Sequence, residues 1–101
     1  MKIPKTVREF FARPALWCKG AAARLADGKG TGSNDPQAVS WCLASAVNLV
    51  YGDEKSSLIM QQLLAIINRD RTSRFESLEP WNDAPERKYK HVRQLICEAD
   101  I

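Results

Sequence analysis

The segment Asp35–Gly52, DPQAVSWCLASAVNLVYG, decides the fold of this chain. Asp35 suits the N-cap of a helix, and Pro36 suits the first helical position, where its missing N–H is harmless. The residues that follow are apolar on nearly every side, as in a helix at the centre of a bundle. Gly52 stands where such a helix ends. The sequence therefore predicts a central helix over about 36–51.

Further helix signals flank this segment on both sides. The sequence TVRE at 6–9 matches a capping box, and DAPE at 83–86 matches a second one that opens the last helix. An apolar stripe with helical spacing runs through about 54–69. Residues 15–26 continue as an alanine-rich helix or as an irregular segment, because Gly20 disfavours helix by about 1 kcal/mol relative to alanine.

These elements predict the fold class of the whole chain. No segment alternates with a strand period for long enough to build a sheet. We therefore expect residues 1–101 to form a single all-α domain, a compact bundle of four to five helices around the central one. Its hydrophobic content of 45% is sufficient for one core. The glycine-rich segment 27–34 is predicted to be a loop, and 70–82 to be irregular, with anchors on the core at Phe75, Leu78 and Trp81.

Charge and cysteine usage restrict the function classes. The net charge of +3 is too small to predict a polyanionic partner, although residues 1–34 carry seven basic and two acidic residues. That excess fits either solubility or a surface for acidic protein or nucleic acid. Three distant cysteines and one histidine match no zinc spacing, so no metal or cofactor is expected. We expect a cytoplasmic protein without a signal peptide or membrane span, and the oligomeric state stays open.

Tryptophan and arginine are the side chains that most often dominate protein interfaces. The three tryptophans fit a buried core, but Trp17 also fits a partly exposed binding group near Arg24. The run 69–74 contains three arginines, which fit a solvated loop or phosphate contacts. The glycine loop lacks P-loop spacing and fits a flexible turn, although its amides and a lysine could hold an anion. The candidate binding residues are Trp17, Arg24, Lys29, Arg69, Arg71 and Arg74.

Catalytic chemistry has little support in this sequence. Cys42 could act as a nucleophile with His91 as its base, but Cys42 lies in an apolar helix, where a buried thiol is usually inert. No third residue that would orient His91 is identifiable. The prominent aspartates stand where helix caps or turns need them. We therefore expect no catalytic residues and a protein that is not an enzyme.

Four short motifs follow one another along the chain. They are WCKGA at 17–21, DG at 27–28, WCLASA at 41–46 and WNDAP at 81–85. Together they resemble an uncharacterised family of small proteins from bacteria and their phages, with Ser45 where that family's pattern has glycine. The resemblance covers 17–100 and implies phage or prophage carriage, but it implies no activity.

The motif residues suggest where a ligand would bind if the protein has a pocket. Asn82 is the least explained of them, because a helix cap beside Asp83 would be redundant. The candidate pocket residues are therefore Asp27, Trp41 and Asn82.

The sequence favours one function and leaves two alternatives. We expect a small phage- or prophage-derived module that binds a host or phage protein, for example as an inhibitor of a host enzyme or defence system. The first alternative is a nucleic-acid-associated module that uses the basic N-terminal third with Arg69, Arg71 and Arg74. The second is a small-ligand or enzymatic site around Trp41, Cys42, Asp27 and Asn82.

Overall fold

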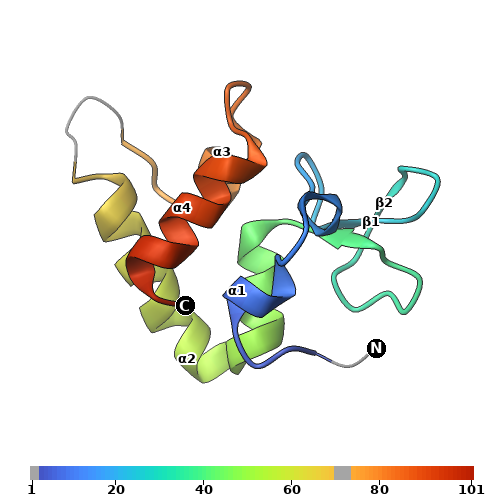
Figure 1. The fold of residues 1–101 in the computed structure, drawn as a ribbon, viewed down its shortest axis with the longest axis horizontal. Coiled ribbons are helices and arrows are strands. Elements are labelled where there is room, and N and C mark those ends of the chain that lie inside the picture. The colour runs from blue at the N-terminus through green and yellow to red at the C-terminus, as the bar shows by residue number, and fades with distance from the viewer. Residues whose placement is uncertain (1–2, 70–73) are drawn as a thin grey trace.

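A computed structural model describes residues 3–69 and 74–101 and combines four helices with a small sheet (Figure 1). The fold is therefore α+β, and the prediction of an all-α bundle is wrong. The helices gather on one side of the molecule and the strands on the other. The elements are α1 (Val7–Phe10), a 3-10 turn (Pro14–Leu16), β1 (Ala23–Arg24), β2 (Gly30–Thr31), β3 (Ser40–Trp41), α2 (Leu43–Ile67), α3 (Leu78–Asp83) and α4 (Tyr89–Ala99).

Residues 15–26 were predicted to be an alanine-rich helix or an irregular segment. They contain no α-helix and contribute the strand β1 to the sheet. β1 is its middle strand and pairs antiparallel with both β2 and β3. Ala23 lies opposite Thr31 on one side and opposite Trp41 on the other. Gly20 adopts φ +80°, which ends any helix in this region. Strands of two residues are too short to show an alternating pattern, so the sequence could not reveal them.

The central helix begins seven residues later than predicted, at Leu43. Asp35 does not cap it. Its carboxylate accepts hydrogen bonds from Thr31 Oγ1 at 2.6 Å and from the Gln37 amide at 2.9 Å, which closes a turn. The first residues of α2, from Leu43 to Val47, are all buried. This confirms that the apolar segment occupies the centre of the fold.

α2 joins the two helices predicted on either side of Gly52. Gly52 adopts the non-helical angles φ 77° and ψ 169°, so the first arm of α2 ends there as predicted, and a kink leads into the second arm. The second arm runs to Ile67, two residues short of the predicted end. The Asn68 side chain then bonds both backbone groups of Phe75, at 2.8 Å and 2.9 Å. These bonds fix the chain on both sides of residues 70–73, which lie outside the described residues.

The C-terminal helices depart from the predicted boundaries but keep the predicted buried residues. Part of the segment expected to be irregular forms α3, in which Leu78 and Trp81 are buried anchors, as predicted. Asp83 ends α3 and does not open the last helix. α4 begins at Tyr89, six residues after Asp83, where the last helix was predicted to open. Its buried residues are Val92, Leu95, Ile96 and Ala99.

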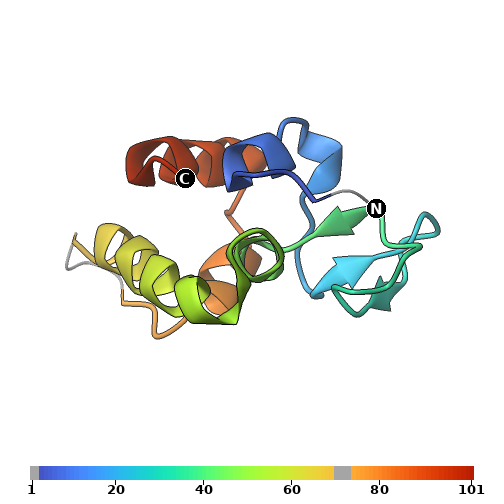
Figure 2. The same ribbon diagram turned by 90° about the horizontal axis from the view of Figure 1, so that it is seen from below.

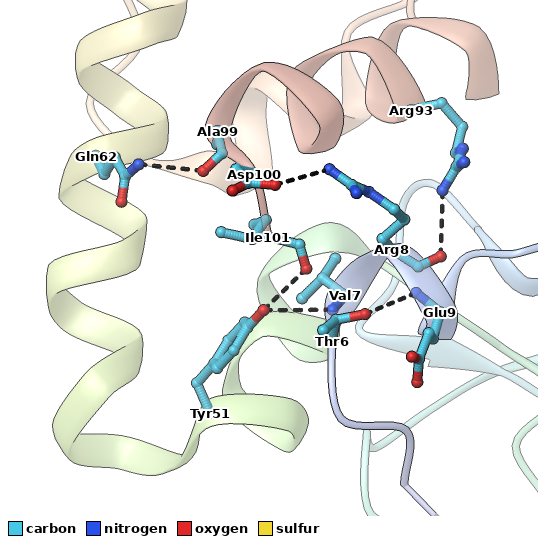
Figure 3. Close-up of polar contacts among 10 residues, drawn as sticks. All are labelled: Thr6, Val7, Arg8, Glu9, Tyr51, Gln62, Arg93, Ala99, Asp100 and Ile101. Carbon is cyan, nitrogen blue, oxygen red and sulfur yellow. Dashed lines mark hydrogen bonds and ion pairs between the residues drawn. The ribbon is translucent and has the colours of Figure 1, made fainter.

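α1 and α4 form a layer over α2 (Figure 2). As predicted, Thr6 caps α1 and accepts the Glu9 amide at 3.1 Å. The Tyr51 hydroxyl, just before the kink of α2, donates to the carbonyl of Ile101 at 2.9 Å and accepts the Val7 amide at 3.5 Å (Figure 3). These bonds connect α1, α2 and the end of α4. In the described parts of the chain, no helix has both the length and the apolar content needed to cross a membrane.

Candidate functional site

Asn82 is a fully buried side chain that connects three segments distant in sequence. Its Oδ1 accepts hydrogen bonds from Trp17 Nε1 at 2.6 Å and from the Leu43 amide at 3.1 Å. Its Nδ2 donates to the Cys18 carbonyl at 3.0 Å and to Asp83 Oδ1 at 2.9 Å. A buried amide left without partners would cost about 1–3 kcal/mol. The complete set of bonds therefore explains why asparagine fits this position.

The start of α2 depends on this remote side chain. Cys42 is the N-cap residue, but its side chain makes no capping hydrogen bond. Asn82 supplies the cap from α3, since it accepts the amide of Leu43. Asp83 Oδ1 also accepts the Gly20 amide at 2.9 Å. The motifs at 17–21, 41–46 and 81–85 therefore meet around Asn82.

A pocket of about 280 Å³ opens beside this junction. Its walls are mostly small side chains, because glycine and alanine line the approach from 20–22 and the first turn of α2. Its polar groups include the buried Cys42 and Ser45, whose Sγ and Oγ are 3.3 Å apart. The lining residues are Gly20, Ala21, Ala22, Cys42, Ala44, Ser45, Asn48, Glu79 and Asp83.

The charge of the pocket is negative. Glu79 and Asp83 are its two charged lining residues and lie four positions apart on the exposed face of α3. The N-terminus of α2 opposes them with only about half a positive charge. Lys19 and Arg24 do not line the pocket, and both are bonded to backbone groups: Lys19 donates to the Ala84 carbonyl at 2.6 Å, and Arg24 donates to the Lys19 carbonyl at 2.7 Å. A cationic group is therefore the ligand chemistry that this pocket favours.

None of the predicted pocket residues lines the pocket. Trp41 is buried, and its Nε1 donates to the Ser33 carbonyl at 3.1 Å. Asp27 lies in the turn after β1, where it accepts the Lys29 amide at 3.0 Å. Asn82 forms the support behind the pocket. The sequence did not single out Glu79, and α3 was not predicted to be a helix.

The predicted binding residues are distributed over separate parts of the fold. Trp17 is half-buried and bonded to Asn82, and Arg24 bonds backbone carbonyls of its own loop. Lys29 is exposed beside β2, whereas Arg69 pairs with Glu98 at 2.7 Å. The structure therefore does not gather these residues into one surface. Arg74 is exposed, and Arg71 lies outside the described residues.

A second depression, a groove of about 470 Å³, lies between the second arm of α2 and α4. His91 lines it, whereas Cys42 lines the pocket on the other side of α3, so these two side chains form no catalytic pair. Burial lowers the pKa of His91, and Arg87, Lys90 and Lys88 lower it further by repulsion. The lining residues are Ile66, Ile67, Arg69, Trp81, Arg87, His91, Gln94, Leu95 and Glu98.

The thiols divide into buried and exposed ones. Cys18 and Cys42 are buried and Cys97 is exposed, all as free cysteines. Burial raises the pKa of the Cys18 thiol, which keeps it protonated. Within residues 3–69 and 74–101, no three His, Cys, Asp or Glu side chains are grouped as metal ligands.

A comparison with known protein families identifies the family of this chain. The profile of a family of unknown function, DUF6197, matches residues 7–100. The chain belongs to this family. No curated protein and no solved structure matches it. The DUF6197 match extends from α1 to the end of α4, so it includes the pocket and the groove.

Proposed function

We propose that this DUF6197 protein is a non-enzymatic binding module that takes a basic side chain of a partner protein into the pocket beside α3. The observation that supports this proposal is the pair Glu79 and Asp83 beside a pocket with small, mostly uncharged walls. Its volume of about 280 Å³ lies just below the range of about 300–1,000 Å³ typical of small-molecule sites. A single side chain fits such a space better than a cofactor does.

The polar groups of the pocket suit an ammonium or guanidinium group. Both cations donate several hydrogen bonds and accept none. Glu79 and Asp83 offer carboxylate oxygens, and Ser45 and Asn48 add uncharged acceptors. A charge-assisted hydrogen bond in a partly enclosed site is about twice as strong as a neutral one. The pocket would therefore select lysine or arginine over a neutral side chain.

The concrete form of the proposed function is inhibition of a host enzyme or defence protein by a phage- or prophage-derived protein. This part of the proposal rests on the resemblance of four short motifs to those of small bacterial and phage proteins. An inhibitor of this kind needs only a rigid surface that grips one exposed basic residue of its target. The Asn82 junction provides such rigidity, because it fixes all three segments around the pocket.

The test is a titration of the labelled protein followed by ¹⁵N NMR. The probes are N-acetyl-lysine amide, N-acetyl-arginine amide and the free polyamine putrescine. We expect either amino-acid probe to shift the amides of 20–22 and 42–48 in a saturable manner. The Glu79→Gln/Asp83→Asn variant should lose these shifts. The side-chain oxygen that remains at position 83 can still accept the hydrogen bond from the Gly20 N–H. Glu76→Gln is the matched control, because Glu76 is exposed outside the pocket.

Each outcome of this titration decides the proposal. Saturable binding of putrescine without either amino-acid probe would identify a receptor for free polyamines and overturn the protein-binding proposal. Absence of saturable shifts for all three probes would show that the pocket does not bind cations. Equal binding by the Glu79→Gln/Asp83→Asn variant would show that the carboxylates are not the recognition groups.

A further inference from the structure

Arg87 has an unusually fixed side chain in the groove between α2 and α4. Its guanidinium lies over the ring of Trp81, 4.1 Å from the ring centroid, and its Nε donates to the Trp81 carbonyl at 2.8 Å. The residue is half-buried. Stacking and this bond together hold the plane of the guanidinium, so little entropy is lost when it binds a ligand.

The terminal nitrogens of Arg87 remain available. A guanidinium carries five N–H donors in a planar fork, and one of them is used by the Trp81 carbonyl. Among the hydrogen bonds of residues 3–69 and 74–101, neither Nη atom is a donor. A fixed fork with free ends matches a carboxylate, which accepts two parallel hydrogen bonds.

Four apolar side chains are among the residues that line the groove. Ile66 and Ile67, at the end of α2, are half-buried, and Leu95 of α4 is buried beside them. Trp81 contributes its ring from α3. Apolar side chains beside a stacked tryptophan and arginine are the residue types found at the energetic centre of protein interfaces.

Basic residues outnumber acidic ones around His91 in the groove. Arg69 and Glu98 pair with each other at 2.7 Å, so their charges compensate. Lys88 and Lys90 are exposed next to Arg87, and their repulsion acts on His91 inside the groove. Glu86 is the acidic residue that opposes them there. The remaining charge is positive, which disfavours a basic partner and favours an acidic one.

We infer that this groove binds an acidic, amphipathic segment of a partner protein. A glutamate or aspartate of that segment pairs with both Nη atoms of Arg87, and its apolar side chains cover Ile66 and Ile67. The apolar residues of the lining favour a peptide over nucleic acid, because a phosphate backbone cannot pack on them. The groove lies on the opposite side of α3 from the acidic pocket, so this inference does not depend on the proposed function.

The test starts from a random-peptide display selection on the whole protein. We expect enriched peptides that combine apolar residues with at least one acidic residue. A selected peptide is then compared with its counterpart, in which Glu and Asp are replaced by Gln and Asn, by isothermal titration calorimetry. We expect the amide counterpart to bind at least tenfold more weakly. NMR shifts should locate the peptide at the amides of Ile66, Ile67 and Leu95.

Variants of Arg87 make the test specific. Arg87→Ala should lose at least tenfold in affinity, and Arg87→Lys should fall in between, because it keeps the charge without the fork. Arg87→Lys also serves if Arg87→Ala fails to fold. Arg13→Ala is the matched control, since Arg13 is an exposed arginine outside the groove. The Glu79→Gln/Asp83→Asn variant should bind the peptide normally, which separates this inference from the cation pocket.

Three results would overturn the inference. The first is a selection that enriches no peptides dependent on Arg87. The second is equal affinity for the acidic peptide and its amide counterpart. The third is displacement of the peptide by duplex DNA that binds the groove more tightly, which would identify a nucleic-acid surface.

Discussion

Trp17 and Asn82 are 65 positions apart in sequence, yet Trp17 Nε1 donates a hydrogen bond of 2.6 Å to Asn82 Oδ1. The same oxygen caps α2 through the Leu43 amide. A tryptophan that composition suggests as a binding anchor is thus bonded into the junction that organises the fold. Its indole N–H is no longer free to meet a partner protein.

Replacement of Asn82 should be strongly destabilising. Asn82→Ala leaves three protein groups without their present partner: the indole N–H of Trp17, the amide of Leu43 and the carbonyl of Cys18. Each buried group left unpaired costs about 1–3 kcal/mol, so we expect a loss of roughly 3 kcal/mol or more in the free energy of unfolding. Urea denaturation measures it. Asn48→Ala, at an exposed position, should change stability by about 0.5 kcal/mol or less. Similar losses for both variants would refute the junction's importance.

The junction shows what the sequence could and could not predict. The buried start of α2 is encoded by a local run of apolar residues and was predicted correctly. The role of Asn82 depends on groups that are 39 and 65 positions away, and no local pattern records such contacts. A side chain with four bonded partners looks the same in sequence as a surface asparagine.

Two errors in the predicted boundaries share one cause. Asp35 and Asp83 were assigned to helix N-caps, but Asp35 closes a turn and Asp83 ends α3. Aspartate accepts backbone amides in both settings, so its presence does not distinguish a cap from a turn. The error at Asp83 also prevented the prediction of the pocket, because Glu79 and Asp83 lie on one face only when this segment is a helix.

The hydroxyl of Tyr51 should stabilise the contact between α1 and the chain's end. Tyr51→Phe removes the bond to the Ile101 carbonyl and the weaker one from the Val7 amide. We expect a loss of about 1–2 kcal/mol. Hydrogen exchange should quicken at the amide of Arg8, which donates to the same carbonyl at 3.2 Å. Unchanged exchange there would contradict this role.

The exposed thiol of Cys97 should react with iodoacetamide before the buried thiol of Cys18. Cys97 is exposed and should be modified first under native conditions. Cys18 should be protected both by burial and by its raised pKa, because the thiolate is the reactive form. Mass spectrometry of the alkylated peptides measures the order. Urea should equalise the rates of Cys18 and Cys97, and rapid native modification of Cys18 would disprove the prediction.

His91 should titrate below the ordinary histidine value. Burial and the neighbouring Arg87, Lys90 and Lys88 all lower its pKa. Its Nδ1 also accepts the Lys88 amide at 3.0 Å, which requires an unprotonated nitrogen. Because the folded-state pKa is depressed, the unfolded chain binds more protons, and stability should fall as pH decreases through about 6.5.

The measurement for His91 is a ¹H NMR titration of the chain's single histidine. Lys90→Ala should raise the pKa towards its ordinary value, because one repelling charge is removed. His91→Gln should flatten the dependence of stability on pH between about 5 and 7. A pKa at or above about 6.5 would be inconsistent with the described surroundings.

Alanine substitutions at three glycines should show that a positive φ, and not packing, determines the loss of stability. Gly20 has φ +80°, and a Cβ there would lie 3.1 Å from Arg24 Nη2. That atom ends a flexible side chain, so most of the cost of Gly20→Ala comes from φ, about 1 kcal/mol. Gly28→Ala, at φ +89° with no atom near its Cβ, should cost a similar amount. Gly32 has neither constraint, so Gly32→Ala should be neutral or stabilising by up to about 1 kcal/mol. Thermal unfolding of the three variants checks this ranking, and a destabilised Gly32→Ala would contradict it.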